Sequence, residues 1–574
     1  MASNLLKSTN YASSLLTGLK DMRDTAVLCD FTLVAEKNEF KVHQAVLAGC
    51  SDYFRAMFTI DMQEKGKNVI ELLGVPAQGL TILLDFIYSG ELRCTLDNIS
   101  DVLIAATHLQ VTDAINMCNN YLEELTDRQN CTDMYNVGDH FDLQKVKDKA
   151  MGYILSHFED ITDNGELMKF SAKFLTMILV KDSLRISSEL KLYETVLSWI
   201  RFDSPNRLQY IYSLMSCVRF PLMSPVDLVE KVMTEPMMKE NMQCLELILE
   251  ANSFHMLPVR RPSLVSPRMQ IRNEQLSLIA FDIEDSERLE STNVLDVETY
   301  SWHTLYNCNL ETYLGETCSI GSYLYMCGGI ELFSCAHPVS AKCYRYDPRF
   351  DEWEMVASMQ EPRHDFALAS DDKSLFAIGG VSSGSIKGIV ERYSPRRNQW
   401  LPCKPLVIPV KGLASSHHGG NIYITGGEHT GNAVSNKLWM YNIKQDTWHE
   451  KSPMLQCRMD HGMCTYQDQL YVIAGYGKNL FKAYDVPNIE VYNIELNQWT
   501  IISQNSPKTS SINAVLIETK VYLVGGFSYD DNQKRSDVLC YNIDTNEWDI
   551  VAKISAPAMS VPCTAIRLPK NIFD

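Results

Sequence analysis

Short apolar runs separated by polar turns dominate the chain from about residue 276 onward. Typical runs are LYVIAG at 470–475 and VYLVGG at 521–526, and each ends in a pair of small residues. Such runs predict β-strands with at least one buried face. Paired glycines let the backbone pass close to its neighbours where a side chain would clash. We therefore expect an all-β region in the second half of the chain.

The spacing of aromatic residues indicates that these strands form a repeat. Six tryptophans follow one another at steps of 51, 47, 48, 51 and 49 residues, and a tyrosine stands seven residues before each of the last five. Strands repeating with this period predict a β-propeller with one blade per repeat. The large rings should fill the space between blades, so we interpret them as structural. They are Trp302, Trp353, Trp400, Trp448, Trp499 and Trp548, with Tyr346, Tyr393, Tyr441, Tyr492 and Tyr541.

The two ends of this region look complementary. The first repeat starts at Leu276 with LSLIAFD, where Ala280 and Phe281 replace the glycine pair, and it lacks an opening strand. A stretch that matches an opening strand, CTAIRL from Cys563, stands alone near residue 574. We expect it to pair with the first repeat, because this would remove the open sheet edges. The predicted architecture is a six-bladed propeller closed by a C-terminal strand.

The first half of the chain has a different pattern. After residues 4–28, which fit an amphipathic helix, two short strands are predicted at Phe31–Val34 and Phe40–Val42, followed by a helix from His43. VIELLGV at 69–75 reads as a further strand, and helical patterns follow, which together indicate an α/β unit. From residue 130 to about 257 the pattern is all-helical. The helix over 4–28 would carry Tyr11, Leu15, Leu16, Leu19, Met22 and Ala26 on one face.

Composition narrows the classes of function. The net charge of −19 and the pI near 5.2 argue against nucleic acid or an anionic membrane as a partner. The 17 cysteines are scattered, without a CxxC pair or zinc-ligand spacing, as expected for reduced thiols in the cytoplasm or nucleus. No apolar run is long enough to span a bilayer, and the N-terminal residues do not resemble a secretory signal. We expect a soluble intracellular protein of several domains that needs no cofactor.

Several motifs carry a specific resemblance. The stretch after residue 129 contains NCTDMY (130–135), ETVLSWI (194–200) and VRFPLMSP (218–225), and these resemble the BACK domain of the Kelch-like family. The preceding α/β unit resembles the BTB domain of the same family. The resemblance gives four segments: a BTB domain with its N-terminal helix at 1–129, a BACK domain at 130–257, a linker at 258–273 and Kelch repeats at 274–574. The BTB-like residues are Asp30, Phe40, His43, Leu47, Ser51, Tyr53, Phe54, Met57 and Phe58, with the later FIYSGEL.

The resemblance implies adaptor work rather than catalysis. Kelch-like proteins use the BTB and BACK domains to form homodimers and to hold the ubiquitin-ligase scaffold cullin-3, while the propeller holds a protein substrate. In that family a hydrophobic–x–Glu motif in the loop after the YFRAMF helix binds cullin, and this chain has Met62-Gln63-Glu64 there, with Phe58 ending the helix. The apolar side chain would enter a groove while the carboxylate accepts hydrogen bonds at its rim. Gln44 departs from the Lys or Arg usual after the BTB histidine, a change we interpret as mild.

The substrate should bind to loops at one face of the propeller. The loops before the inner strands carry Arg363, Asp365, Lys411, Arg458, Asp460, Thr509 and Ser511, and the loops after the glycine pairs carry Phe333, Tyr476, Phe481, Phe527 and Tyr529. We expect these aromatic residues to be exposed and able to anchor a peptide. The other interpretation is that the arginines form salt bridges from blade to blade. The mixture of Arg and Asp gives no preference for an acidic or a basic substrate.

Three other functions fit the sequence less well. A copper oxidase would need two His, two Tyr and one Cys converging at one point, whereas His417 and His418 are adjacent and point to opposite faces of a strand. A dimeric scaffold that crosslinks actin or another filament is the main alternative, since it uses the same domains without a cullin motif. A transcription factor would need a DNA-binding module that the sequence lacks. The sequence therefore favours a non-catalytic substrate adaptor of a cullin-3 ubiquitin ligase.

Overall fold

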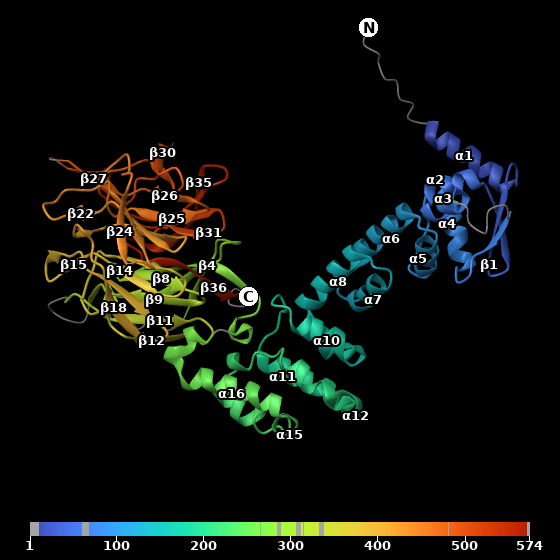
Figure 1. The fold of residues 1–574 in the computed structure, drawn as a ribbon, viewed down its shortest axis with the longest axis horizontal. Coiled ribbons are helices and arrows are strands. Elements are labelled where there is room, and N and C mark those ends of the chain that lie inside the picture. The colour runs from blue at the N-terminus through green and yellow to red at the C-terminus, as the bar shows by residue number, and fades with distance from the viewer. Residues whose placement is uncertain are drawn as a thin grey trace, which may run out of the picture. The chain divides into compact units, whose positions relative to one another are not determined.

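The computed structural model describes residues 11–59, 68–264, 266–283, 289–305, 312–313, 315–331, 338–479, 482–504 and 506–570 (Figure 1). The chain divides into two compact units. Unit 1 comprises Met1–Phe170 and Ser183–Arg185, and unit 2 comprises Ser171–Asp182 and Ile186–Asp574. Unit 1 is mostly helical, and unit 2 combines helices with a long series of antiparallel sheets.

Unit 1 contains the predicted α/β fold. Strand β1 pairs antiparallel with β2 and parallel with β3, so the sheet order is β2-β1-β3. The strand predicted over VIELLGV is shorter than expected and ends at Glu71, because Gly74 turns the backbone into a left-handed conformation with φ +78°. The elements are α1 (Tyr11–Asp24), β1 (Phe31–Ala35), β2 (Asn38–Val42), α2 (Gln44–Cys50), α3 (Asp52–Thr59), β3 (Val69–Glu71), α4 (Ala77–Ser89), α5 (Ile99–His108), α6 (Thr112–Leu125), α7 (Cys131–His140), α8 (Gln144–Ser156), α9 (Phe158–Asp163) and a 3-10 turn at Glu166–Lys169.

His43 is a core residue whose two ring nitrogens both have partners. Its Nδ1 lies 2.9 Å from the Tyr88 hydroxyl, and its Nε2 lies 3.0 Å from the carbonyl of Val27. The neighbouring Gln44 donates its backbone N–H to the Asp30 carboxylate at 2.9 Å. The departure at Gln44 therefore leaves the start of helix α2 supported by a side chain from the preceding strand region.

The helical part of unit 2 comes before the sheets. Polar side chains cap three of its helices: Ser171 accepts from the N–H of Phe174, Ser188 from that of Lys191, and Asn241 from that of Cys244. The elements are α10 (Ala172–Leu179), α11 (Glu189–Phe202), α12 (Ser204–Arg207), α13 (Ile211–Met215), α14 (Pro225–Asp227), a π-helical turn (Leu228–Val232), α15 (Pro236–Lys239), α16 (Met242–Met256) and 3-10 turns at Leu208–Tyr210, Phe220–Leu222, Pro258–Ser263 and Pro267–Met269.

Residues 274–570 form six antiparallel sheets, each built on a path of four strands within the described residues. We number them by sequence repeat. Sheet 1 is β36 (Cys563–Pro569), β4 (Glu274–Ile283), β5 (Leu289–Leu295) and β6 (Trp302–Leu305); sheet 2 is β8 (Glu316–Ile320), β9 (Tyr323–Cys327), β11 (Cys343–Asp347) and β12 (Glu352–Val356); sheet 3 is β13 (Ala367–Ser370), β14 (Leu375–Ile378), β17 (Val390–Ser394) and β18 (Gln399–Cys403).

The remaining sheets repeat this order. Sheet 4 is β20 (Ala414–His418), β21 (Asn421–Thr425), β23 (Leu438–Asn442) and β24 (Thr447–Lys451); sheet 5 is β25 (Gly462–Tyr466), β26 (Gln469–Ile473), β29 (Ile489–Asn493) and β30 (Gln498–Ser503); sheet 6 is β31 (Val515–Ile517), β32 (Lys520–Val524), β34 (Gln533–Asn542) and β35 (Glu547–Ala558), with β33 (Phe527–Ser528) on β34. Short ladders join β7 (Thr312–Tyr313) to β10 (Ile330–Glu331), β15 (Val381–Ser382) to β16 (Ser385–Ile386), β19 (Val410–Lys411) to β22 (Glu428–His429), and β27 (Tyr476–Lys478) to β28 (Ala483–Asp485).

The repeated tyrosines and tryptophans are structural. Each pair lies directly opposite across two strands, as Tyr441 and Trp448 do with ring centroids 4.8 Å apart. The Tyr441 hydroxyl donates to Asp446 at 2.6 Å, and the Trp448 indole N–H donates to the carbonyl of Lys404 after the preceding sheet at 2.9 Å. Asp446 also accepts the backbone N–H of Lys404. Trp302, Trp400 and Trp499 make the same indole bond to the preceding sheet, whereas the Trp548 N–H has no partner among the described residues. The fixed spacing of seven residues follows from the pairing of Tyr and Trp across one hairpin.

The chain segment near residue 563 pairs with the first repeat as the sequence predicted. Strand β36 runs antiparallel to β4 in register from Cys563 opposite Ala280 to Pro569 opposite Glu274 (Figure 1). Strand β4 continues through Ala280 and Phe281 to Ile283, so the missing glycine pair lengthens this strand. The first strands of the six sheets also adjoin one another: β36 lies beside β8, β8 beside β13, β13 beside β20, β20 beside β25, β25 beside β31, and β31 beside β36.

The segment predicted as a linker is anchored at both ends within unit 2. Arg261 lies 3.2 Å from the carboxylate of Asp347, which also accepts from Arg349 at 2.7 Å. At the other end, Arg272 pairs with Glu189 of helix α11 at 2.6 Å. All five of these side chains are buried, so each charge depends on its partner. The segment therefore joins the helices and the sheets of unit 2 firmly.

Candidate functional site

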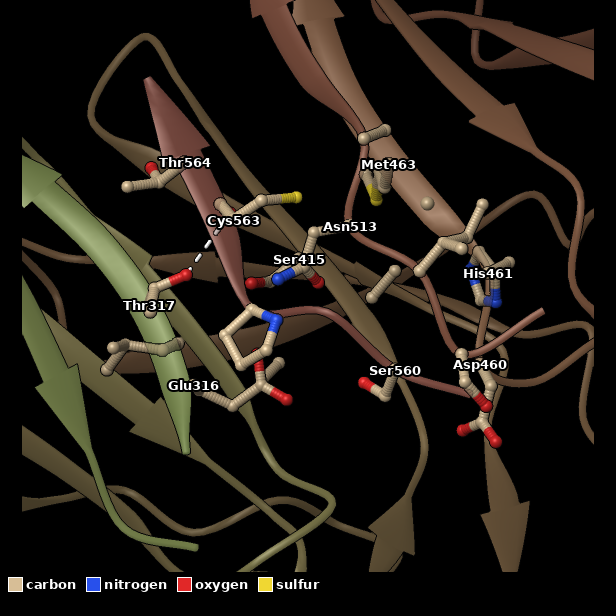
Figure 2. Close-up of a pocket in the computed structure, with 18 of the residues that line it drawn as sticks. Glu316, Thr317, Ser415, Asp460, His461, Met463, Asn513, Ser560, Cys563 and Thr564 are labelled. Carbon is tan, nitrogen blue, oxygen red and sulfur yellow. Dashed lines mark hydrogen bonds between the residues drawn. The ribbon is translucent and has the colours of Figure 1, made fainter. Parts of the chain in front are cut away.

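A cavity of about 480 Å³ lies where the first strands of the six sheets begin. We call it the main cavity. Every sheet contributes to its wall, through the residues at or just before its first strand. Figure 2 shows Glu316, Asp460, His461, Ser560 and Cys563 on this wall. Its volume falls in the range of binding sites for small molecules or single side chains.

A repeated backbone conformation builds one part of this wall. Asp365, Gly412, Asp460 and Ser511 precede the first strands of sheets 3 to 6, and all have positive φ between 50° and 60°. The N–H of Gly412 donates to the carbonyl of Asp365, that of Asp460 to Gly412, and that of Ser511 to Asp460, at 2.8–2.9 Å. These bonds link successive sheets and fix the position of the side chains at each step.

Three carboxylates share the main cavity. Burial, with the nearby charges of Asp365 and Asp460, raises the pKa of Glu316 to about 8. Burial and the Asp365 charge likewise raise the pKa of Asp460 to about 7, although Lys411 and Lys478 oppose the shift. The cavity therefore carries several acidic groups, of which Glu316 and Asp460 hold protons close to neutral pH.

The two arginines predicted for the substrate face are buried instead. Arg363 is 1% exposed and pairs with Glu391, and Arg458 is 0% exposed and pairs with Glu490. Each glutamate lies on the third strand of the same sheet as its arginine, β17 or β29. The salt bridges are thus internal to one sheet, and the expectation that they run from blade to blade is wrong. Neither side chain has surface free for a ligand.

The other residues predicted for the substrate face lie on the loops before the first strands and after the glycine pairs. Lys411 and Lys478 both pair with Glu428, at 3.3 Å and 2.8 Å. Tyr476 is 5% exposed, so the expectation that it is an exposed anchor is wrong, and its ring stacks on half-buried Tyr529 with centroids 4.0 Å apart. Half-buried Phe527 packs edge-on against Tyr529. Phe333 and Phe481 lie outside the described residues.

Sequence reasoning missed Glu316. It begins strand β8 of sheet 2, twelve residues before the first glycine of its pair. The same count gives the small residues Ala367, Ala414 and Gly462 in sheets 3, 4 and 5, and Asn513 in sheet 6. A carboxylate at a position held by small residues in three of the other sheets is the signal that could have found it.

Ionisation of Glu316 in the main cavity should make the unfolding free energy depend on pH. The folded protein holds the Glu316 proton more tightly than the unfolded chain does, since its pKa rises from 4.5 to about 8. The unfolding free energy should therefore fall as pH rises from about 4.5 to about 8. Between about pH 6 and about pH 8.5, wild-type protein should lose roughly 2 °C more in Tm than Glu316→Gln, measured by scanning fluorimetry. Glu495→Gln, an exposed turn substitution, is the control and should behave as wild type. Parallel curves for all three proteins would contradict the prediction.

Across the described ranges, no group of three or more His, Cys, Asp or Glu side chains is arranged to hold a metal ion. None of the helices that the structure describes has the length and apolar character needed to cross a membrane.

Comparison with known proteins covers almost all of the chain. Family models match a BTB/POZ domain at residues 19–126, a "BTB And C-terminal Kelch" (BACK) domain at 131–233, and a KLHDC2/KLHL20/DRC7 Kelch-repeats domain at 316–526 and 372–566. Kelch-like protein 26 of Danio rerio is 32% identical over 570 residues, which is 98% of this chain and 94% of that protein. The chain belongs to the Kelch-like family. Similar relatives include Kelch-like protein 26 of Homo sapiens, 32% identical over 91% of this chain and 86% of that protein, and Kelch-like protein 36 of Bos taurus, 29% identical over 92% and 88%.

The Kelch-like BTB domain contains one described residue of the predicted cullin site. Phe58 lies in helix α3 and is half buried, with its ring 5.0 Å from Phe31 and 5.8 Å from Phe54. Met62 and Glu64 lie outside the described residues. These contacts hold Phe58 against the BTB core near the end of helix α3.

Proposed function

We propose that this Kelch-like protein is the substrate-recognition adaptor of a cullin-3–RING ubiquitin ligase. One observation carries the proposal: BTB, BACK and Kelch domains occur in this order along a chain that aligns end to end with Kelch-like relatives. In this role the chain holds two proteins near each other and carries out no bond chemistry itself. The described cysteines are all free thiols, which supports a cytoplasmic or nuclear location.

The substrate-binding part would be a six-bladed propeller closed by its C-terminal strand. The pairing of β36 with β4 and the neighbouring first strands of the six sheets support this architecture. A closed ring leaves no first or last blade with an open inner edge. Its loops before the first strands then form one face, with the main cavity at its centre.

The cullin-binding part would combine the BTB domain with the opening helices of the BACK domain, all of them in unit 1. Phe58, Met62 and Glu64 would supply an apolar anchor and a carboxylate at its rim. Helices α7 and α8 pack together as a pair and would extend this surface. A BTB homodimer would present two substrate sites to one ligase, which raises the effective concentration of a bound substrate.

Binding of the purified protein to the N-terminal domain of cullin-3, measured by calorimetry, tests the proposal. Wild type should bind with a sub-micromolar Kd, about −8 kcal/mol or stronger. Met62→Ala/Glu64→Lys should lose at least about tenfold in affinity, since both the anchor and the carboxylate are removed. Glu495→Gln, on an exposed turn of sheet 5, is the control.

Light scattering should first show that each protein is a folded dimer. A folded wild-type dimer without measurable binding would exclude the cullin role. Co-sedimentation with actin filaments would then test the scaffold alternative.

A further inference from the structure

We propose that Cys94 and Cys118 form a reversible disulfide, in which Cys94 reacts first with an oxidant and Cys118 completes the bond. The inference goes beyond the adaptor function and does not depend on it. The sequence predicts scattered, reduced thiols, and the described cysteines are free. In a reducing compartment, two thiols in contact are the arrangement from which a transient disulfide forms. The BTB domain of unit 1 holds such a pair.

The two thiols come from different elements of the BTB domain. Cys94 lies between helices α4 and α5, in a stretch that forms neither helix nor strand, and Cys118 lies on helix α6. The Cys118 thiol donates a hydrogen bond to the sulfur of Cys94. The sulfur atoms of a disulfide are about 2 Å apart, so the bond requires only a short approach from this contact.

Helix α6 is held in place by helix α8, so the approach would move Cys94. The Nζ of Lys145 donates to the side-chain oxygen of Asn120 at 3.1 Å, and the Nζ of Lys149 donates to the carbonyl of Glu123 at 2.6 Å. Cys94 stands in an irregular segment, and its neighbours on both sides are exposed. An exposed segment outside helices and strands shifts at a lower cost than a packed helix.

The two thiols differ in their access to solvent. Cys94 is half buried, whereas Cys118 is 0% exposed. Burial raises the pKa of both thiols, that of Cys118 to about 12, while the hydrogen bond from Cys118 opposes the rise at Cys94. Because the thiolate is the reactive form, Cys94 is the thiol that an oxidant meets first. Cys118 is then placed to attack the modified sulfur of Cys94.

Oxidised glutathione, a small soluble disulfide, is the oxidant in this reaction. The Cys94 thiolate attacks one of its sulfurs, the S–S bond of glutathione breaks, and one reduced glutathione leaves. The Cys118 thiol then loses its proton and attacks the Cys94 sulfur, which releases the second glutathione. The two protein thiols give up two electrons and two protons, and these convert one oxidised glutathione into two reduced ones.

A second pair of cysteines provides an internal comparison. Cys327 and Cys343 lie directly opposite each other on strands β9 and β11 of sheet 2. They are 1% and 0% exposed, and burial raises the pKa of Cys327 well above its ordinary value. Both pairs bring two thiols together, but this one lacks an accessible member. We therefore expect Cys327 and Cys343 to remain reduced in the folded protein.

Mass spectrometry of the full-length protein tests the inference. Reduced protein is treated with oxidised glutathione at about pH 8, its remaining thiols are alkylated, and it is digested without reduction. The Cys94–Cys118 disulfide should form at least about tenfold faster than a Cys327–Cys343 disulfide, and dithiothreitol should restore both thiols. Equal rates for the two pairs, or Cys94 that stops at the mixed disulfide with glutathione, would overturn the inference.

Three variants test the order of the two steps. Cys118→Ala should leave Cys94 as the mixed disulfide with glutathione, because the resolving thiol is gone. Cys94→Ser should leave Cys118 unmodified, and modification of Cys118 in this variant would refute the assigned order. Cys50→Ser, which removes an exposed thiol of helix α2, is the control and should form the disulfide within about twofold of the wild-type rate. The comparison of the two pairs needs wild-type protein alone and stands even if a variant fails to fold.

Discussion

Removing strand β36 by ending the chain after Pro562 should prevent the Kelch region from folding. The truncation removes a seven-residue ladder with β4 and exposes the buried partners of Ile566 and Leu568 in the cores of sheets 1 and 2. It also removes the carbonyl of Cys563 that accepts from Thr317 of sheet 2. The loss exceeds the stability of a typical domain, since each large buried aliphatic side chain contributes about 2–5 kcal/mol.

Limited proteolysis and near-ultraviolet circular dichroism measure this outcome. The truncated protein should be cut throughout residues 274–562, while unit 1 should remain resistant. Leu568→Ala should give a milder loss of about 2–5 kcal/mol. Arg567→Ala, an exposed neighbour in the same strand, should change stability by less than about 1 kcal/mol. A truncated protein with wild-type protease resistance would show that β36 is dispensable.

Replacing Arg458 by methionine should destabilise the Kelch region by about 3–5 kcal/mol. The substitution leaves Glu490 buried without its cation, with the N–H groups of Leu455 and Gln456 as its remaining donors among the described residues. It also leaves the carbonyls of Ala474 and Asn488 without the guanidinium that they accept from. An unpaired charge in a site this dry costs more than the lost attraction alone.

A double-mutant cycle with Glu490→Gln tests this cause. The pair Arg458→Met/Glu490→Gln should lose clearly less than the sum of the single variants, as denaturation curves would show. Arg535→Met is the control, because its partner Asp531 is on the surface and the pair should contribute less than about 1 kcal/mol. Additive losses at Arg458 and Glu490 would mean that the two side chains act independently.

The repeat could be predicted from sequence because its signals are local. A tyrosine and a tryptophan seven residues apart, such as Tyr492 and Trp499, face each other across one tight turn, so their spacing is fixed by a single hairpin. The partner of the first repeat was also predictable, since CTAIRL matched the one strand that the repeat lacked. The BTB and BACK motifs were recognisable for the same reason.

The roles of the site residues could not be predicted in this way. Arg363 and Arg458 are separated from Glu391 and Glu490 by 28 and 32 residues, and nothing local marks those glutamates as partners. Whether an arginine before a strand points into the sheet or into solvent depends on this distant contact. The burial of Tyr476 likewise depends on Tyr529, which follows in another repeat. Which charged side chains of the substrate face are paired with a distant partner could therefore be seen only in the folded structure.

The ion pair between Arg261 and Asp347 limits how far residues 258–272 can bend. Because Arg261 and Arg272 hold the two ends of their segment, residues 258–272 act as a strut and not as a tether. A protein bound by the Kelch loops would then keep a fixed position relative to helix α16. An insertion into residues 258–272 would disrupt the ion pairs at the two ends of the segment before it let the Kelch region move further. The lysines of a captured substrate that come within range of ubiquitin would then be selected by the way the substrate is gripped, and bending at residues 258–272 would not widen that choice.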